Sequence, residues 1–394
     1  MYYTASFGYL GLCLCSKKIR KIGQMDNGMT GIGRINAVDA LRGFAISAIL
    51  LIHSSNHFLY SGIPQSSPEW LLQLDEILKS FLYFIFEGKA YSVFALLFGF
   101  TYALQLDKRM SKGMDMKYRM MWRMLLLALF GFFNAAFFAG GDPLIFYALC
   151  MIPVIFLRHA GNKVLFWVGL FFLVQPLEWL NYDFHLFDDN YSVFYENMGN
   201  TLKTGNFVEI VKMNVTDGVK GCQLWAFQTG RMSQTLGLFC IGMLTYRTGF
   251  FIRDVSFYKR MTLYSLALSV LLYMVVIAVG NIPLRMYYNL SSSVCMVNLL
   301  LWAYYKSQNV SFWYYMRIYG RMSLTNFICQ SVICTFLFYP WGLHLGLTVG
   351  TSLSILLAII VLVAQIIFSR FWLNYHKQGP LEHLWHKLTW IQNC

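Results

Sequence analysis

Long apolar segments separated by short charged loops limit what this chain of 394 residues can fold into. Only 12% of its residues are charged, whereas a soluble domain averages about 25%. A helix needs about 20 mainly apolar residues to cross a bilayer. The expected spans are 38–57, 78–106, 120–140, 143–157, 163–180, 231–248, 260–280, 286–305, 319–339 and 347–369. The predicted fold is an all-α integral membrane protein, a polytopic bundle of about ten transmembrane helices.

The loops between these segments alternate in charge. Lysine and arginine gather around residues 17–34, 108–123, 158–163, 253–260, 306–317 and 370–387. The intervening loops have few basic residues and include Glu69, Asp142, Asp188 and Glu196. Cytoplasmic loops carry the excess of basic residues, so both termini are expected in the cytoplasm. This topology explains the formal net charge of +13 without a nucleic-acid partner.

Three parts of the chain are distinguished. In residues 1–33 an apolar run precedes the basic residues, the reverse of a secretory signal, and Met25 or Met29 as the start would make this part an extension. Residues 34–370 form the predicted membrane domain, with an outer loop at 181–230. The loop's stretch 207–215 is predicted to be an amphipathic helix, and the loop is either a lid or a cover over the bundle. Residues 371–394 form a tail whose short helix is expected in the cytoplasmic headgroup region.

The first apolar segment places three chemically active side chains on one helix. Asp39 and Arg42 are three residues apart and can pair. Arg42 and His53 are eleven apart, which on a helix is an offset of about 20° and a rise of roughly 16 Å. His53 is therefore a candidate general base inside the membrane, and the alternative is a neutral histidine bonded to a backbone carbonyl. Arg42 is a candidate for phosphate binding.

Glu87-Gly88-Lys89 interrupts the second apolar segment with two charges. Charges this deep must be paired or face a wet cavity. Glu87 could orient His53 or bind a substrate hydroxyl, and Lys89 could meet an anion. The alternative is a helix break at Gly88, with both charges extending to the membrane surface.

Arg231 and Arg321 each begin a later apolar segment, on opposite sides of the predicted membrane. Arg321 is a candidate phosphate ligand because a guanidinium can bind two oxygens at once. Asn326 and Gln330 share a helix face, where they either bond neighbouring helices or line a cavity. The nine cysteines form no Cys-x-x-Cys pair, so neither a metal site nor a disulfide framework is expected.

Four stretches resemble the YeiB family of bacterial membrane proteins, also called domain of unknown function 418. They are Asp39-Ala-Leu-Arg-Gly-Phe-Ala45, Glu87-Gly-Lys-Ala-Tyr-Ser-Val-Phe-Ala-Leu-Leu-Phe-Gly99, Gly320-Arg-Met-Ser-Leu-Thr-Asn326 and Gly379-Pro-Leu-Glu-His-Leu-Trp385. That family is similar to a wider superfamily of transmembrane acyltransferases, whose first helix carries Arg-x10-His with a catalytic histidine. Arg42 and His53 fit that spacing.

The resemblance implies a bacterial inner-membrane acyltransferase with no bound cofactor. Acyl-CoA would be the co-substrate on the cytoplasmic side, and a glycan or lipid-linked hydroxyl or amine would be the acceptor. The expected catalytic residues are His53 and Glu87, and the expected substrate- or donor-binding residues are Asp39, Arg42, Lys89, Arg231, Arg321 and Asn326. The alternative is a transporter or exporter of a small metabolite, with Glu87, Lys89 and His53 as a coupling site.

Overall fold

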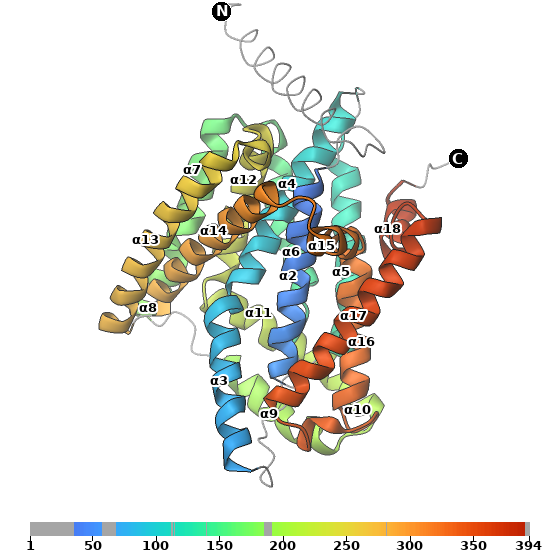
Figure 1. Cartoon of the computed structure of the whole chain (residues 1–394). Coiled ribbons are helices and arrows are strands. Elements are labelled where there is room, and N and C mark those ends of the chain that lie inside the picture. Colours follow the sequence, from blue (N-terminus) through green and yellow to red (C-terminus); the bar gives the residue numbers. More distant parts are fainter. Residues whose placement is uncertain are drawn as a thin grey trace, which may run out of the picture.

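The computed structural model describes residues 35–56, 68–111, 113, 115–138, 140–184, 191–280 and 282–390, in which every regular element is a helix (Figure 1). The α-helices are α2 (Asn36–Ser55), α3 (Glu69–Phe86), α4 (Lys89–Met110), α5 (Lys117–Phe137), α6 (Pro143–Phe156), α7 (Asn162–Val174), α8 (Pro176–Phe184), α9 (Tyr191–Thr204), α10 (Phe207–Met213), α11 (Val219–Gln228), α12 (Arg231–Arg247), α13 (Val255–Val279), α14 (Ile282–Lys306), α15 (Ser311–Arg321), α16 (Ser323–Phe338), α17 (Thr351–Tyr375) and α18 (Pro380–Thr389). The prediction of an all-helical protein is confirmed.

Six helical stretches of the described residues are long and apolar enough to cross a membrane: Asn36–Ser55, Glu69–Met110, Lys117–Phe137, Asn162–Asn181, Val255–Val279 and Thr351–Tyr375. The pair α15 and α16 raises the number to seven if it counts as one span. The helices α6, α12 and α14 also stand at expected spans, but they are not among these candidates. The chain is a helical membrane protein, and the number ten stays a prediction.

Two expected spans are interrupted. The segment 78–106 divides into α3 and α4 at Gly88, whose φ of 73° suits a residue without Cβ. The segment 319–339, expected as one helix, is instead the end of α15 and the whole of α16, which meet at Met322 with a bend of 84°. That expectation was wrong in this respect.

Glycines let the central helices approach one another closely. A Cβ on Gly320 of α15 would lie 1.9 Å from the carbonyl oxygen of Asp39 on α2, and one on Gly43 would lie 2.1 Å from that of Met316. A second crossing joins α4 to α12, where a Cβ on Gly99 would lie 2.3 Å from the carbonyl oxygen of Phe239. Small residues at such crossings are typical of helix packing in membranes. These contacts fix α2 and α4 in the centre of the bundle (Figure 1).

The loop after α8 folds over one end of the bundle as α9, α10 and α11. The predicted helix at 207–215 is confirmed as α10 and the π-turn that follows it, and Asn206 and Glu209 form a capping box at its start. Ile210 and Met213 pack in one cluster with Leu50 of α2. This packing favours the cover over the lid.

Candidate functional site

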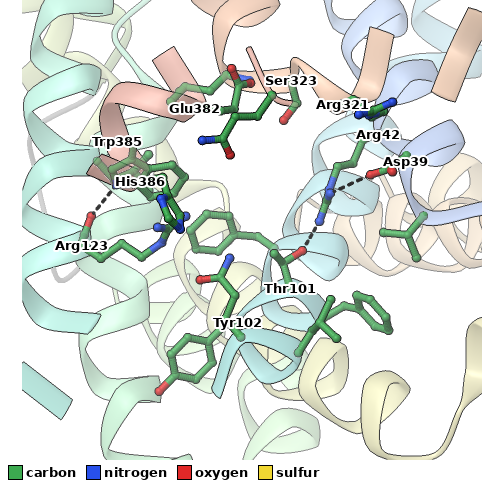
Figure 2. Close-up of a pocket in the computed structure, with 18 of the residues that line it drawn as sticks. Asp39, Arg42, Thr101, Tyr102, Arg123, Arg321, Ser323, Glu382, Trp385 and His386 are labelled. Atoms are coloured by element: carbon green, nitrogen blue, oxygen red, sulfur yellow. Dashed lines mark hydrogen bonds and ion pairs between the residues drawn. The ribbon is translucent and has the colours of Figure 1, made fainter. Parts of the chain in front are cut away.

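A cavity of about 510 Å³ opens beside Arg42, between α2, α4, α5, the α15–α16 bend and α18 (Figure 2). We call it the basic cavity, because five cationic side chains and two carboxylates line it: Arg42, Lys108, Arg109, Arg123, Arg321, Asp39 and Glu382. In Figure 2, Arg42 and Arg321 lie on one side of the space, and Arg123 and His386 lie on the other. Such a surplus of positive charge suits a ligand with several phosphate groups.

The predicted pairing of Asp39 with Arg42 is confirmed. The two side chains form an ion pair of 3.2 Å one helical turn apart on α2. Arg42 also donates to the hydroxyl of Thr101 on α4. Both residues line the cavity, and Asp39 is only 2% exposed, so the ion pair holds the guanidinium of Arg42 at the cavity wall. A ligand would thus meet an arginine whose position is already fixed.

The last helix, α18, closes the other wall through two stacked pairs. The guanidinium carbon of Arg123 lies 3.6 Å from the ring centroid of Trp385, and that of Arg109 lies 3.8 Å from the ring centroid of Trp390. Trp385 also donates its indole N–H to the carbonyl oxygen of Arg123 at 3.1 Å. These contacts place two further cations against the cavity by cation–π attraction. The tail helix therefore packs on α5 as part of the cavity wall.

Glu382 joins α18 to the start of α16. Its carboxylate accepts hydrogen bonds from the backbone N–H of Leu324 at 2.7 Å and of Thr325 at 3.2 Å, and from the Thr325 hydroxyl at 2.5 Å. The first N–H groups of a helix have no partner within it, and a carboxylate there is favourable. Burial raises the pKa of Glu382 above its ordinary value, against the effect of these hydrogen bonds.

Arg321 lines the basic cavity as predicted and donates to the carbonyl oxygen of Lys377 at 3.1 Å. Asn326 lies outside the cavity lining and is 1% exposed. It donates to the carbonyl oxygen of Tyr319 at 3.0 Å and to the hydroxyl of Ser369 at 3.1 Å. These bonds tie α16 to α15 and α17, which is the structural role considered for it. A role of Asn326 in binding stays a prediction.

His53 lies at the far end of α2 and does not line the basic cavity. Its ring packs edge-on against Phe138, with the centroids 4.6 Å apart. Ile46 and Ile49 occupy the same face of α2 between Arg42 and His53, and Ile46 is fully buried. A ligand that extends from Arg42 to His53 along this face of α2 would displace these two side chains.

The structure places Glu87, Lys89 and Arg231 around the break at Gly88, away from the basic cavity. Glu87 forms an ion pair of 2.9 Å with Arg285 of α14. Lys89 is 5% exposed and donates to the carbonyl oxygen of Phe84 at 2.6 Å. Arg231 is 4% exposed and donates to the carbonyl oxygen of Gly88 at 3.2 Å and to the Gln234 side chain at 2.9 Å. Of the two alternatives for this segment, the break at Gly88 is confirmed, but Lys89 does not extend to the surface.

Sequence reasoning missed several residues of the basic cavity, among them Thr101, Arg109, Arg123 and Trp385. Arg123 could have been found, because it falls within the apolar segment 120–140 and is 9% exposed. A charged residue inside a span is by default a functional candidate. The predicted topology uses its charge only as part of the basic stretch 108–123.

Comparison with known proteins agrees with the sequence pattern. Residues 245–392 match the family described as "Protein of unknown function (DUF418)". The chain is 30% identical to the uncharacterized protein YeiB of Escherichia coli over 392 residues, covering 89% of this chain and 95% of that protein. It is 24% identical to the uncharacterized protein YxaH of Bacillus subtilis over 91% of this chain and 94% of that protein. No solved structure matches it. The chain therefore belongs to the YeiB (DUF418) family.

Proposed function

We propose that this protein is a membrane acyltransferase that takes its acyl group from acyl-CoA bound in the basic cavity. The acceptor would be a hydroxyl or amine of a glycan or a lipid-linked molecule. The observation that carries the proposal is the cavity of about 510 Å³ lined by five cationic side chains. Coenzyme A has a diphosphate and a further phosphate on its ribose, and arginine binds phosphate oxygens in pairs.

The proposal includes the membrane orientation. About ten crossings in a bacterial inner membrane, with both termini cytoplasmic, would put the basic cavity at the cytoplasmic end of the bundle. Lys108 and Arg109, at the end of α4, belong both to the cavity lining and to a basic loop. A positively charged loop favours the cytoplasmic side. Acyl-CoA is made and used in the cytoplasm, so this orientation gives the donor direct access.

In this proposal His53 is the general base. Its neutral imidazole takes the proton of the acceptor hydroxyl or amine while the acceptor's oxygen or nitrogen attacks the thioester carbonyl carbon. The carbon–sulfur bond breaks, and the leaving thiolate takes the proton from the imidazolium. Arg42 and Arg321 hold the phosphates, and Asp39 orients Arg42. Glu87 lies in an ion pair with Arg285, so we assign it no step.

Two further points support the assignment of His53. The spacing of Arg42 and His53 matches the Arg-x10-His pattern of the transmembrane acyltransferases that the family resembles. The rise of roughly 16 Å between them is comparable to the extended arm that separates the thioester of acyl-CoA from its phosphates. Donor binding would then move Ile46 and Ile49 aside, so that the acyl end reaches His53.

The test is thioester turnover by the purified protein in lipid vesicles. With acetyl-CoA and a membrane glycolipid fraction, the wild type is expected to release free CoA thiol and form an acylated product. His53→Ala should lower this rate by about 100-fold or more, the usual effect of losing a general base. His159→Ala, at an exposed histidine, is the matched control. Transfer by His53→Ala at the wild-type rate would remove the proposed mechanism.

Transport of a small metabolite is the second candidate, and the broken helices favour it. The helices α3 and α4 meet at Gly88, and α15 and α16 meet at a bend of 84°. Interrupted helices often carry the substrate site of transporters. Uptake of a solute by vesicles that contain the protein, with no turnover of acetyl-CoA, would favour this candidate over the enzyme.

A further inference from the structure

A second cavity of about 460 Å³ lies at the Gly88 break, between α3, α4 and the α13–α14 hairpin. We propose that it binds the phosphate of a membrane lipid whose chains lie along the apolar faces of α3 and α13. This inference does not depend on acyl transfer.

The charges at this cavity favour an anion. Lys89, Arg285 and Glu87 line it, and Glu87 pairs with Arg285 at 2.9 Å. The ammonium of Lys89 makes one hydrogen bond within the described residues, to the carbonyl oxygen of Phe84 at 2.6 Å. It lies 4.8 Å from the ring centroid of Tyr288. An ammonium has three donors, so Lys89 retains capacity to bind a ligand oxygen.

Arg231 adds a second buried cation directly behind the break. A Cβ on Gly88 would lie 2.5 Å from the Nη2 of Arg231 and 2.8 Å from the Nδ2 of Asn289, so both groups meet at this glycine. The Nε of Arg231 has no hydrogen-bond partner among the described residues. Three cations therefore surround one carboxylate here, and two of them, Lys89 and Arg231, are buried. A buried positive surplus is costly unless an anion neutralises it.

The approach to this cavity is apolar and exposed. Ile77, Phe81 and Phe84 form one face of α3 and are 66%, 57% and 57% exposed. On α13, Tyr273 and Ile277 share a face and are 38% and 63% exposed. Phe84 and Tyr273 both line the cavity, and their ring centroids lie 5.9 Å apart. Lipid chains on these two faces would end at the charged groups.

The cavity lies at the end of one candidate span, Val255–Val279, and at the Gly88 break within another, Glu69–Met110. Gly280 ends α13, and Arg285 lies in the first turn of α14, so the lining includes the tip of the hairpin. The phosphate of a lipid lies at the end of a membrane span. A free phosphate would make no use of the apolar approach.

The test is lipid binding to the purified full chain by native mass spectrometry, with four probes. They are phosphatidylglycerol, a polyprenyl phosphate, diacylglycerol and inorganic phosphate. Arg285→Gln and Lys89→Gln should each weaken binding of the phosphate-bearing lipid by about tenfold. Glu87→Gln should strengthen it, because the competing carboxylate is lost. Lys259→Gln, on the exposed opposite end of α13, is the matched control and should not change it.

The four probes and the variants distinguish a lipid-phosphate site from its alternatives. Stronger binding of phosphatidylglycerol or of the polyprenyl phosphate than of diacylglycerol supports the site. The lipid that binds more tightly of the two identifies the headgroup that the site prefers. Equal binding by diacylglycerol, or binding of inorganic phosphate as tight as that of the lipid, overturns it. Wild-type affinity in Arg285→Gln and Glu87→Gln also overturns it. These two side chains are 57% and 38% exposed, so their variants should fold even if Lys89→Gln does not.

Discussion

Trp385 stacks on Arg123, with the guanidinium carbon 3.6 Å from the ring centroid, although the two residues are 262 positions apart in the chain. This contact brings α18 against α5 and makes the end of the chain a wall of the basic cavity (Figure 2). The proposed donor site therefore depends on the attachment of α18.

Trp385→Ala should detach α18. The variant loses the cation–π contact and the packing of the indole, so we expect a free energy of unfolding lower by about 2 kcal/mol or more. Thermal unfolding in detergent and limited proteolysis of the tail measure this. Leu384→Ala, at a neighbouring side chain that is 42% exposed, is the control and should change little. Equal melting temperatures for the two variants would contradict the stacking.

Glu382 should make the attachment of α18 depend on pH. Burial raises the pKa of its carboxyl in the folded protein above the ordinary value of 4.5, so the folded state binds the proton more tightly than the unfolded state. The stabilising contribution of the protonated group is complete below the unfolded pKa and is lost as the pH rises through the folded pKa. Compared with wild type, Glu382→Gln should therefore gain stability as the pH rises from 4 to 7.

Unfolding of both proteins across that pH range measures the difference. A constant difference between Glu382→Gln and wild type at every pH would show that the carboxyl titrates at the same pH in both states. A difference of the opposite sign would mean that its hydrogen bonds to α16 outweigh its burial.

Gly320→Ala should disrupt the crossing of α15 with α2. Its Cβ would lie 1.9 Å from the carbonyl oxygen of Asp39, so the helices must separate, at a cost of about 1–3 kcal/mol or more. Gly199→Ala in α9 is the matched control, because a Cβ there meets nothing within 4 Å. It should be neutral or stabilising by about 0.5–1 kcal/mol. Similar losses in both variants would contradict the close crossing.

Ile49→Trp should separate donor binding from acyl transfer. The larger side chain fills the face of α2 between Arg42 and His53, so CoA should still bind while transfer is lost. Binding measured by calorimetry and thiol release measured in vesicles give the two readouts. Transfer at the wild-type rate in this variant would mean that the acyl arm does not pass Ile49.

Local features of the site could be predicted from the sequence. Asp39 and Arg42 are one helical turn apart, so their ion pair follows from the helix alone. The break at Gly88 is one of the two alternatives that the sequence allows. Glycine readily takes the positive φ that the break requires. Both features depend only on residues that are close together in the sequence.

Features that depend on distant contacts could not be predicted. The bend at Met322 has no proline at the break, and it occurs where Gly320 must meet α2 while Glu382 binds the start of α16. The pairing of Arg123 with Trp385 likewise joins two ends of the chain. Hydropathy measures each segment by itself, so it could show neither the bend nor the stacked arginine.

The central claim is that the basic cavity binds the phosphates of an acyl-CoA, and calorimetric titration of the purified protein with CoA tests it most directly. We predict saturable binding that Arg42→Gln weakens by about tenfold or more, since a hydrogen bond to a charged group contributes about 1.5–3 kcal/mol. Lys387→Gln makes the same charge change at an exposed side chain of α18 that does not line the cavity, and this variant should bind as wild type. Equal affinity of Arg42→Gln and wild type, or no binding by wild type, would contradict the account.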